Sequence, residues 1–344
     1  MPTPIKHILV IRLSAMGDVA MTVPVLRAFT QQYPEIKITV LTKSLFAPFF
    51  RNIPNVSIFG AEVKKRHKGL FGLYRLSTEL KKLEIDAVAD LHNVLRSKIL
   101  KLFLSGKNVV QIDKGREEKK ALTSGELFRQ LKTTHQRYAD VFEKLGFPID
   151  LSNPTFPSKE KLNQKVLSIT GEKTDKWIGV APFAAHESKM YPLDALEEVI
   201  EELSESYNVI LFGGGANEIK ILNAFESKFE GVVNIAGKLN LEDELNLISN
   251  LDLMLSMDSG NGHMAAMLGV KVMTIWGVTH PYAGFAPFNQ PENYMLLSDR
   301  EQFPLIPTSV YGNNYPENYK EASRSISPET VVKKIESILI ENDN

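Results

Sequence analysis

Residues that could do chemistry appear first in a turn near the N-terminus. An apolar run, Ile8–Ile11, leads into a small-residue turn with Ser14, Gly17 and Asp18, and a second apolar run follows. In open α/β sheets ligands bind at the carboxyl ends of the strands, so a carboxylate here is placed for catalysis and its neighbours for ligand contact. Ser and Asp side chains also accept hydrogen bonds from the free N–H groups of a helix start. A catalytic role and a capping role are therefore equally open for Asp18.

Two loops in the second half contain groups that bind anions or hydroxyls. Lys189 lies in the loop 183–192, ahead of an expected helix, where an ammonium group could reach an anionic ligand. In the loop 213–218, a glycine run that includes Gly214 lets a ligand approach the backbone, and Glu218 can accept hydrogen bonds from sugar hydroxyls. The spacing is not the Gly-x-Gly-x-x-Gly dinucleotide fingerprint, because Glu218 stands where the third glycine would be. A nicotinamide-dependent enzyme is therefore disfavoured.

A third loop predicts a phosphate site. Asp258, Ser259, Gly260, Gly262 and His263 form a turn, rich in small residues, that opens a helix. The unpaired N–H groups and the positive dipole end of a helix start attract phosphate, and glycines allow close approach, so a pyrophosphate fits here. A helix cap by Asp258 or Ser259 is the structural alternative. All three loops follow expected strands and should share one edge of one sheet.

Other reaction classes have little support in the sequence. The seven histidines are scattered, and neither Asp-x-Asp nor His-x-x-x-His spacing occurs, so no metal ligands and no metal dependence are predicted. No Gly-x-Ser-x-Gly elbow is present, which disfavours an α/β-hydrolase. The absence of cysteine excludes disulfides and thiolate catalysis, and it agrees with a reducing compartment.

Length and composition describe an ordinary globular protein. A chain of 344 residues with 43% hydrophobic and 24% charged residues is long enough for two domains with separate cores. The formal net charge of -1 gives no support to nucleic-acid binding. The apolar run before Arg12, about four residues, is too short for a signal-peptide core or a membrane span. We therefore expect a cytoplasmic protein whose membrane contact, where present, is peripheral.

The elements that must position these loops alternate between strands and helices, which predicts two doubly wound α/β domains facing each other across a cleft. Expected strands cover residues 8–11, 37–42, 87–91, 177–182, 208–212, 232–236, 252–256 and 271–276. Expected helices cover residues 19–33, 73–83, 193–206, 216–229, 241–249 and 262–268, with another from Arg96 and a last one after Ser327-Pro328-Glu329.

The proline-containing segment 153–158 and the polar stretch 159–175 predict the crossover between the domains. We expect domains over residues 1–158 and 159–325, and a C-terminal helix within 326–344 that packs back on the first domain.

Two basic segments have no assigned place in this scheme. Residues Lys64–Arg75 interleave basic and apolar side chains and could lie against an anionic, lipid-linked partner. A solvated loop before a helix is the simpler reading of such a charge run. The basic loop Lys114–Lys120 has the same two interpretations.

At this point the chain resembles the ADP-heptose:lipopolysaccharide heptosyltransferases of glycosyltransferase family nine, which have the two-domain GT-B fold. The resemblance runs through nearly the whole chain. Its strongest elements are Ser14-Ala-Met-Gly-Asp18, Asp258-Ser-Gly-Asn-Gly-His263-Met-Ala-Ala and Trp276-Gly-Val-Thr-His-Pro281. Weaker matches are Asp90-Leu-His-Asn-Val-Leu-Arg96-Ser97, His135-Gln-Arg-Tyr138, and Lys189 with Tyr191-Pro192.

The resemblance implies an inverting, metal-independent transfer of heptose from ADP-heptose to the lipopolysaccharide inner core, without a cofactor. The acceptor would be Kdo-lipid A or a core heptose bound by the first domain, and the second domain would bind the nucleotide sugar. Asp18 would be the general base. Lys189 and the Ser259–Gly262 amides would hold the charge of the leaving diphosphate.

The chain departs from the family pattern at two places. Ala184 and Ala185 stand where the best-known members carry hydroxyl residues just upstream of the phosphate-binding lysine, and Asp90-Leu-His92-Asn93 replaces the pattern Asp-x-Gln-Gly. A family enzyme with a different nucleotide sugar is therefore one alternative. A non-catalytic sugar- or nucleotide-binding protein is the alternative from another class, since two α/β domains also describe such proteins.

Overall fold

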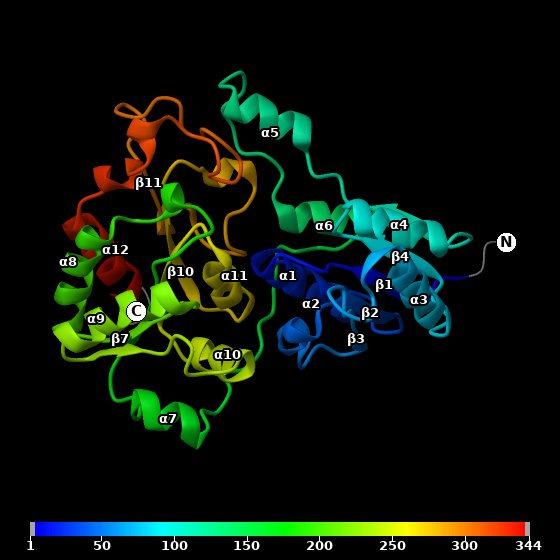
Figure 1. Ribbon diagram of the computed structural model, residues 1–344, viewed down its shortest axis with the longest axis horizontal. Helices are drawn as coiled ribbons and strands as arrows, with labels where there is room; N and C mark the ends of the chain where they lie inside the picture. The colour runs from blue at the N-terminus through cyan, green and yellow to red at the C-terminus, as the bar shows by residue number, and fades with distance from the viewer. Residues whose placement is uncertain (1–3, 341–344) are drawn as a thin grey trace. The chain divides into compact units, whose positions relative to one another are not determined.

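The computed structural model describes residues 4–340, and internal contacts divide the chain into two compact units. Unit 1 contains the chain up to Lys114 together with Thr134–Phe156, and unit 2 contains Gly115–Thr133 together with the chain from Pro157 onward. Figure 1 labels the elements of both units. Each unit has one parallel sheet with helices along the chain between its strands, which confirms the predicted doubly wound α/β class.

Unit 1 is built on a parallel sheet with the strand order β3-β2-β1-β4-β5. Its strands are β1 (His7–Ile11), β2 (Lys37–Thr42), β3 (Val56–Gly60), β4 (Ala87–Asp90) and β5 (Asn108–Gln111). Its helices are α1 (Met16–Ala20), α2 (Thr22–Gln32), α3 (Gly69–Lys81), α4 (Leu95–Phe103) and α6 (Thr134–Glu143), with a 3-10 segment at Ser44–Phe50. Residues Ile8–Ile11 are completely buried, as continuous apolar strands of parallel sheets are.

Unit 2 has the strand order β11-β10-β9-β6-β7-β8. Its strands are β6 (Trp177–Ala181), β7 (Asn208–Leu211), β8 (Val232–Asn234), β9 (Leu253–Met257), β10 (Lys271–Trp276) and β11 (Met295–Leu297). Its helices are α5 (Arg116–Thr123), α7 (Gln164–Thr170), α8 (Leu193–Ser204), α9 (Ala216–Lys228), α10 (Leu241–Ser249), α11 (Gly260–Met267) and α12 (Pro328–Ile340). Between residues 4 and 340, every helix is too short or too polar to cross a bilayer.

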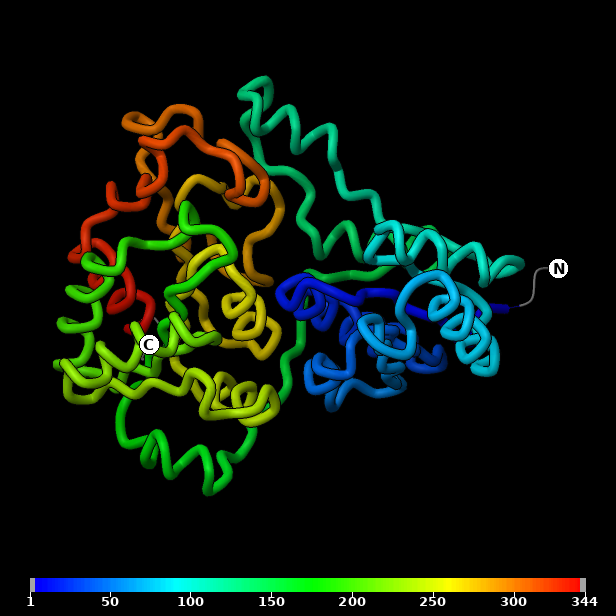
Figure 2. The backbone as a smooth tube through the Cα atoms, in the orientation of Figure 1, coloured from blue at the N-terminus to red at the C-terminus, as the bar shows by residue number. Residues whose placement is uncertain are grey.

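The segment 115–133 follows β5 of unit 1 in the chain but belongs to unit 2. This assignment differs from the expectation that all residues before 158 belong to the first domain. Leu122 and Leu131 are buried in a small apolar cluster with Ala283, and the Leu131 amide donates to the Tyr282 carbonyl at 2.9 Å. In Figure 2 this segment is the part of the tube whose colour lies between cyan and green. Its partners come about 150 residues later in the chain, so local sequence patterns do not reveal it.

The C-terminal helix also differs from its expected packing. Val331, Val332, Ile335 and Ile338 of α12 are buried in the main apolar core of unit 2, with Leu196 and Val199 of α8. Residues 341–344, the end of the predicted segment 326–344, lie outside the described residues. The amphipathic pattern of this helix requires an apolar surface but does not specify which one.

Candidate active site

The strand order of unit 1 places two loops side by side. From β1 the chain continues to β2 and β3 on one side, and it then crosses to β4 on the other side. Ile11, the last residue of β1, pairs with Asp90, the last residue of β4. Ligands of doubly wound sheets bind at such reversals of strand order, outside the carboxyl ends of the strands. The loop with Asp18 and the loop with His92 meet here, and Ser14 Oγ lies 3.4 Å from His92 Nε2.

One carboxylate oxygen of Asp18 is fixed by its surroundings. Oδ2 accepts a hydrogen bond from the Ala15 amide at 3.1 Å, and it pairs with Arg12 Nη2 at 2.6 Å. The other Arg12 terminal nitrogen, Nη1, donates to the Leu91 carbonyl at 2.7 Å, so Arg12 connects the ends of β1 and β4. The hydroxyl of Tyr138 on α6 donates to the Asp18 carbonyl at 3.2 Å. The capping role predicted for Asp18 is thus present at the start of α1.

The second oxygen of Asp18 is open. Among the described residues, no donor contacts Oδ1, and the side chain is 28% exposed. A carboxylate with one oxygen held and one oxygen open can accept a proton from a bound hydroxyl in a defined direction. The capping hydrogen bond therefore leaves one oxygen of Asp18 available, and Gly17 lies in α1 next to it.

Arg12 was not singled out as a functional residue by its sequence. It follows the apolar strand β1 directly and is only 6% exposed. A cation that continues a buried strand requires a buried partner, because an isolated charge is costly to remove from water. That signal was present in the sequence, but the identity of the partner needed the fold.

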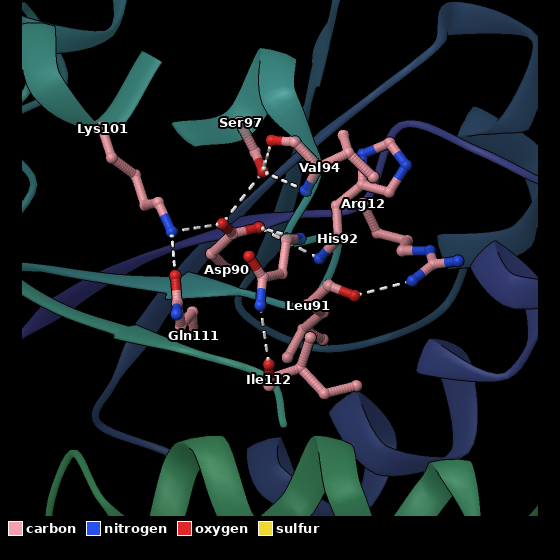
Figure 3. Close-up of polar contacts among 10 residues, drawn as sticks. Arg12, Asp90, Leu91, His92, Val94, Ser97, Lys101, Gln111 and Ile112 are labelled. Atoms are coloured by element: carbon pink, nitrogen blue, oxygen red, sulfur yellow. Dashed lines mark hydrogen bonds and ion pairs between the residues drawn. The ribbon is translucent and has the colours of Figure 1, made fainter. Parts of the chain in front are cut away.

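A buried network fixes the loop after β4 (Figure 3). Asp90 is completely buried, and its Oδ1 accepts hydrogen bonds from the amides of His92 and Asn93 at 3.0 and 2.8 Å. Its Oδ2 accepts from Ser97 Oγ at 3.0 Å and pairs with Lys101 Nζ at 2.7 Å. Asp90 thus holds the loop rather than facing a ligand, and it orients His92 beside Ser14.

His92 is held as a neutral imidazole. Burial, together with the positive charges of Arg12 and Lys114, lowers the pKa of His92 to about 4. The side chain is 6% exposed, and its Nδ1 has no hydrogen-bond partner among the described residues. A neutral ring can share a hydrogen bond with Ser14 without repelling Arg12.

This neutral state predicts a pH dependence of stability. Below about pH 6.5 the unfolded chain binds a proton at His92 that the folded protein accepts only near pH 4. The contribution of His92 to the free energy of unfolding should therefore fall as the pH is lowered from 6.5 to 4. His280 in unit 2 should add to the fall, because burial and Arg300 lower its pKa to about 4 as well. Urea unfolding at a series of pH values measures this slope.

In the His92→Gln variant, the free energy of unfolding should depend less on pH, because the contribution of His92 is absent. In the double variant His92→Gln, His280→Gln, the contributions of both histidines should be absent. An unchanged slope in His92→Gln would contradict the neutral state of His92.

Unit 2 has the same kind of reversal between β6 and β9, where Ala181 pairs with Ser256. The loops that follow these strands contain Lys189 and Asp258, whose Nζ and Oδ2 atoms are 2.9 Å apart. Thr279, after β10, donates to the same Oδ2 at 2.9 Å. The Lys189 and Asp258 side chains are 12% and 9% exposed. The structure therefore brings together two candidates that lie far apart in the sequence.

Two glycines shape the surroundings of Lys189. A Cβ at Gly312, whose φ is +78°, would lie 2.5 Å from Lys189 Cγ, so this backbone packs directly on the lysine stem. The Ser188 hydroxyl donates to the Gly312 carbonyl at 2.6 Å. A Cβ at Gly277 would collide with the Ser188 carbonyl. Gly277, Thr279 and Gly312 were not predicted as site residues, because their partners lie far away in the chain.

The start of α11 keeps its N–H groups available. Ser259 precedes the helix but its side chain makes no capping hydrogen bond, and its Oγ has no partner among the described residues. Asp258 binds Lys189 and Thr279 instead of capping. Gly262 is required by close approach, since a Cβ there would lie 2.5 Å from Ser256 Oγ. The alternative of a helix cap by Asp258 or Ser259 is therefore not seen in the described structure, and an anion could use the free N–H groups of Gly260 and its neighbours.

The remaining predicted residues of unit 2 lie on the same sheet edge. Glu218, in the first turn of α9, accepts a hydrogen bond from the Gly214 amide at 2.7 Å through Oε2. Phe183, after β6, lies against Gly213, so the loops after β6 and β7 are neighbours. His263 is 7% exposed on α11. No contact joins Glu218 directly to Lys189 or Asp258 within the described part of the chain.

The two sets of residues offer different chemistry. Ser14, Gly17 and Asp18 in unit 1 supply an open carboxylate oxygen. Unit 2 supplies an ammonium group and a helix start, which together suit a diphosphate. Across residues 4–340, no three side chains of the His, Cys, Asp and Glu types gather closely enough to hold a metal ion.

The family model for Glycosyltransferase family 9 (heptosyltransferase) matches residues 73–306 of the sequence. The chain belongs to glycosyltransferase family 9. The resemblance noted in the sequence is thereby confirmed, and the protein is a glycosyltransferase. The matched range of this family 9 enzyme includes Lys189, Glu218 and Asp258, whereas Asp18 precedes it.

Curated relatives of the family 9 enzyme span most of its length. The lipopolysaccharide core heptosyltransferase OpsX of Haemophilus influenzae is 25% identical over 85% of this chain and 84% of its own. The lipooligosaccharide heptosyltransferase 2 of the same organism is 27% identical over 97% of this chain and 99% of its own.

Solved structures share the fold of the family 9 enzyme. A glycosyl transferase family 9 protein from Veillonella parvula aligns with a TM-score of 0.77 at 22% identity, over 98% of both chains. The ADP-heptose lps heptosyltransferase II of E. coli aligns with a TM-score of 0.70 at 20% identity, over 98% of this chain and all of its own. At these identities the likeness shows a common architecture.

Proposed function

We propose that this family 9 enzyme transfers a heptose from ADP-heptose to the inner core of lipopolysaccharide. The observation that carries the proposal is the family match together with relatives that are named lipopolysaccharide heptosyltransferases over more than three quarters of this chain. The acceptor is then a lipid-linked oligosaccharide, Kdo-lipid A or a core heptose. The enzyme works at the cytoplasmic face of the inner membrane, where its contact with the bilayer is peripheral.

Asp18 is the general base in this proposal. Its open Oδ1 takes the proton of an acceptor hydroxyl while the hydroxyl oxygen forms a bond to the anomeric carbon. The bond from that carbon to the diphosphate oxygen breaks, and ADP leaves with the electron pair from the opposite face, so the anomeric configuration inverts. Arg12 acts as a positioning residue because it binds Oδ2 and so fixes the direction of the carboxylate.

Unit 2 binds the donor in this proposal. Lys189 and the N–H groups at the start of α11 stabilise the charge that develops on the diphosphate, and such preorganised donors are typically worth about 3 kcal/mol each in the transition state. Asp258 holds Lys189 in place, and the free oxygen of Glu218 accepts a hydrogen bond from a sugar hydroxyl. Transfer proceeds without a metal ion or a cofactor, because these groups supply the positive charge.

A nucleotide panel tests the choice of donor. Melting is measured with ADP, UDP, GDP and CMP, and only ADP should raise the melting temperature strongly, since a ligand at 100 times its Kd stabilises the fold by about 2.7 kcal/mol. Transfer from ADP-heptose to a core acceptor should persist in EDTA.

A shift with UDP or GDP alone would show a different nucleotide sugar, which Ala184 and Ala185 specifically favour as the alternative. Loss of activity in EDTA would contradict the metal-independent mechanism. Nucleotide binding without any sugar transfer would favour a binding protein.

A further inference from the structure

Five large apolar side chains on two neighbouring helices of unit 1 are exposed to solvent. Leu70, Phe71 and Tyr74 on α3 are 60%, 92% and 60% exposed, and Leu95 and Leu102 on α4 are each 75% exposed. We call these five residues the α3–α4 surface. Single exposed apolar residues are common, but a group of this kind marks an interaction site.

Helix geometry shows why α3 presents this face. Leu70, Phe71 and Tyr74 have spacings of one, three and four residues, which places them on one side of the helix. The opposite side carries Leu73, Leu76 and Leu80, which are buried in the core of unit 1. The helix is therefore apolar on both sides, and only one side finds partners within unit 1.

An aromatic contact joins the exposed side of α3 to the end of α4. The rings of Tyr74 and Phe103 meet edge to face with centroids 5.6 Å apart, and Phe103 follows Leu102 directly. Figure 1 shows α3 and α4 next to each other, and the two helices are in contact. The apolar residues thus belong to one two-helix surface.

This part of the chain is strongly basic. Residues 64–107 contain eleven Lys and Arg against four Asp and Glu, in a chain whose formal net charge is -1. Asp90 is buried, Asp86 accepts hydrogen bonds from the amides of Lys6 and His7, and Glu79 pairs with Arg66. The remaining acidic residue is Glu84. The exposed Lys64, Lys65, Lys68, Arg75, Arg96 and Lys98 have no acidic partner among the described residues.

The basic turn at residues 64–68 is held in a fixed position against α3 by backbone packing and hydrogen bonds. Gly72 lies so close to the backbone of His67 that a Cβ there would collide with it. The His67 Nδ1 accepts a hydrogen bond from the Glu62 amide at 3.0 Å, and its Nε2 lies 3.3 Å from Glu79 on α3. Lys64, Lys65 and Lys68 are therefore held at the N-terminal end of the helix that carries Leu70 and Phe71.

We propose that the α3–α4 surface docks on an anionic lipid bilayer, with Phe71 and its apolar neighbours entering the interface and the lysines binding lipid phosphates. Basic residues beside exposed aromatic and leucine side chains suit an anionic bilayer, because each basic residue near such a surface adds attraction. Protein interfaces, in contrast, are depleted in lysine. The proposal deepens the proposed function, since it names the surface through which the enzyme reaches a lipid-linked acceptor.

Vesicle flotation tests the docking. The protein should bind vesicles of phosphatidylcholine with phosphatidylglycerol, bind pure phosphatidylcholine weakly, and dissociate in high salt, because attraction of exposed charges is screened. Phe71→Ser with Leu70→Ser should reduce binding at least tenfold. Lys64→Glu with Lys65→Glu should reduce it by a similar factor.

Matched controls come from unit 2. Leu305 and Tyr311 are 60% and 58% exposed, close to the values of Leu70 and Tyr74, and Leu305→Ser with Tyr311→Ser should leave binding unchanged. Equal loss in this control, or binding that survives Phe71→Ser with Leu70→Ser, would overturn the proposal. Dimerisation that Phe71→Ser abolishes, without vesicle binding by the wild type, would assign the surface to a second copy instead.

A kinetic readout separates docking from transfer. With a vesicle-borne acceptor, Lys64→Glu with Lys65→Glu should raise the KM for the acceptor and leave the KM for the donor unchanged. With a soluble, delipidated acceptor, the variant and the wild type should have equal kcat/KM. Vesicle binding without heptose transfer would disprove the proposed function but not the docking, and transfer without vesicle binding would disprove the docking alone.

Discussion

Asp18→Asn should lower kcat for sugar transfer by roughly 10²–10⁴-fold, the usual contribution of a general base. Asn has nearly the same shape as Asp, so it can still accept a hydrogen bond from the Ala15 amide, but it cannot take a proton from the acceptor. The Kd of the nucleotide should change little, because the predicted donor site lies in unit 2. Steady-state kinetics and nucleotide titration on the same preparation measure the two effects.

The control for Asp18→Asn is Glu35→Gln, which removes an exposed carboxylate of the same unit and should leave kcat unchanged. Loss of the Asp18 charge also leaves Arg12 unpaired, so the melting temperature must be recorded for both variants. If Asp18→Asn is folded and turns over at the wild-type rate, Asp18 is not the base.

Lys189→Met should affect both stability and catalysis. Removal of one partner of a buried ion pair costs about 3–5 kcal/mol, because the largely buried Asp258 then lacks its cationic partner. Loss of a preorganised positive group should also lower kcat by about 10²–10³-fold. Urea unfolding measures the first effect and transfer kinetics the second.

The double variant Lys189→Met, Asp258→Asn separates these effects. The buried charge is then absent, so stability should recover substantially, whereas turnover and nucleotide affinity should remain low. Recovery of activity together with stability would show that Lys189 only neutralises Asp258 and does not act on the donor.

The order of elements could be predicted from the sequence, but parts of each sheet could not. The long apolar strands, such as 8–11 and 177–182, are recognisable because parallel strands are buried on both faces. The edge strand β5 has exposed polar residues at both ends, and β11 is apolar but only three residues long, so neither gives a pattern long enough to recognise as a strand.

The candidate-site residues that follow a strand could be predicted from the sequence. The residues whose role depends on a contact with a distant part of the chain could not. Asp18, Lys189 and Asp258 follow strand ends, and such positions share an edge in any doubly wound sheet. The pairing of Arg12 with Asp18 and the packing of Gly312 on Lys189 depend on strand order and on a long loop, which no local pattern encodes. His92 was visible as a departure from the family pattern, but its neutral state follows from burial.

The excursion of residues 115–133 has a consequence for synthesis on the ribosome. The Leu131 amide donates its hydrogen bond to the carbonyl of Tyr282, which the ribosome adds about 150 residues later. At about 5–20 residues per second, the ribosome needs roughly 8–30 s to make this stretch. During that time Leu122 and Leu131 lack the residues against which they pack. Unit 1, in contrast, has its complete sequence once residue 156 has been synthesised. A chain stalled before residue 282 should thus present this segment to proteases and chaperones.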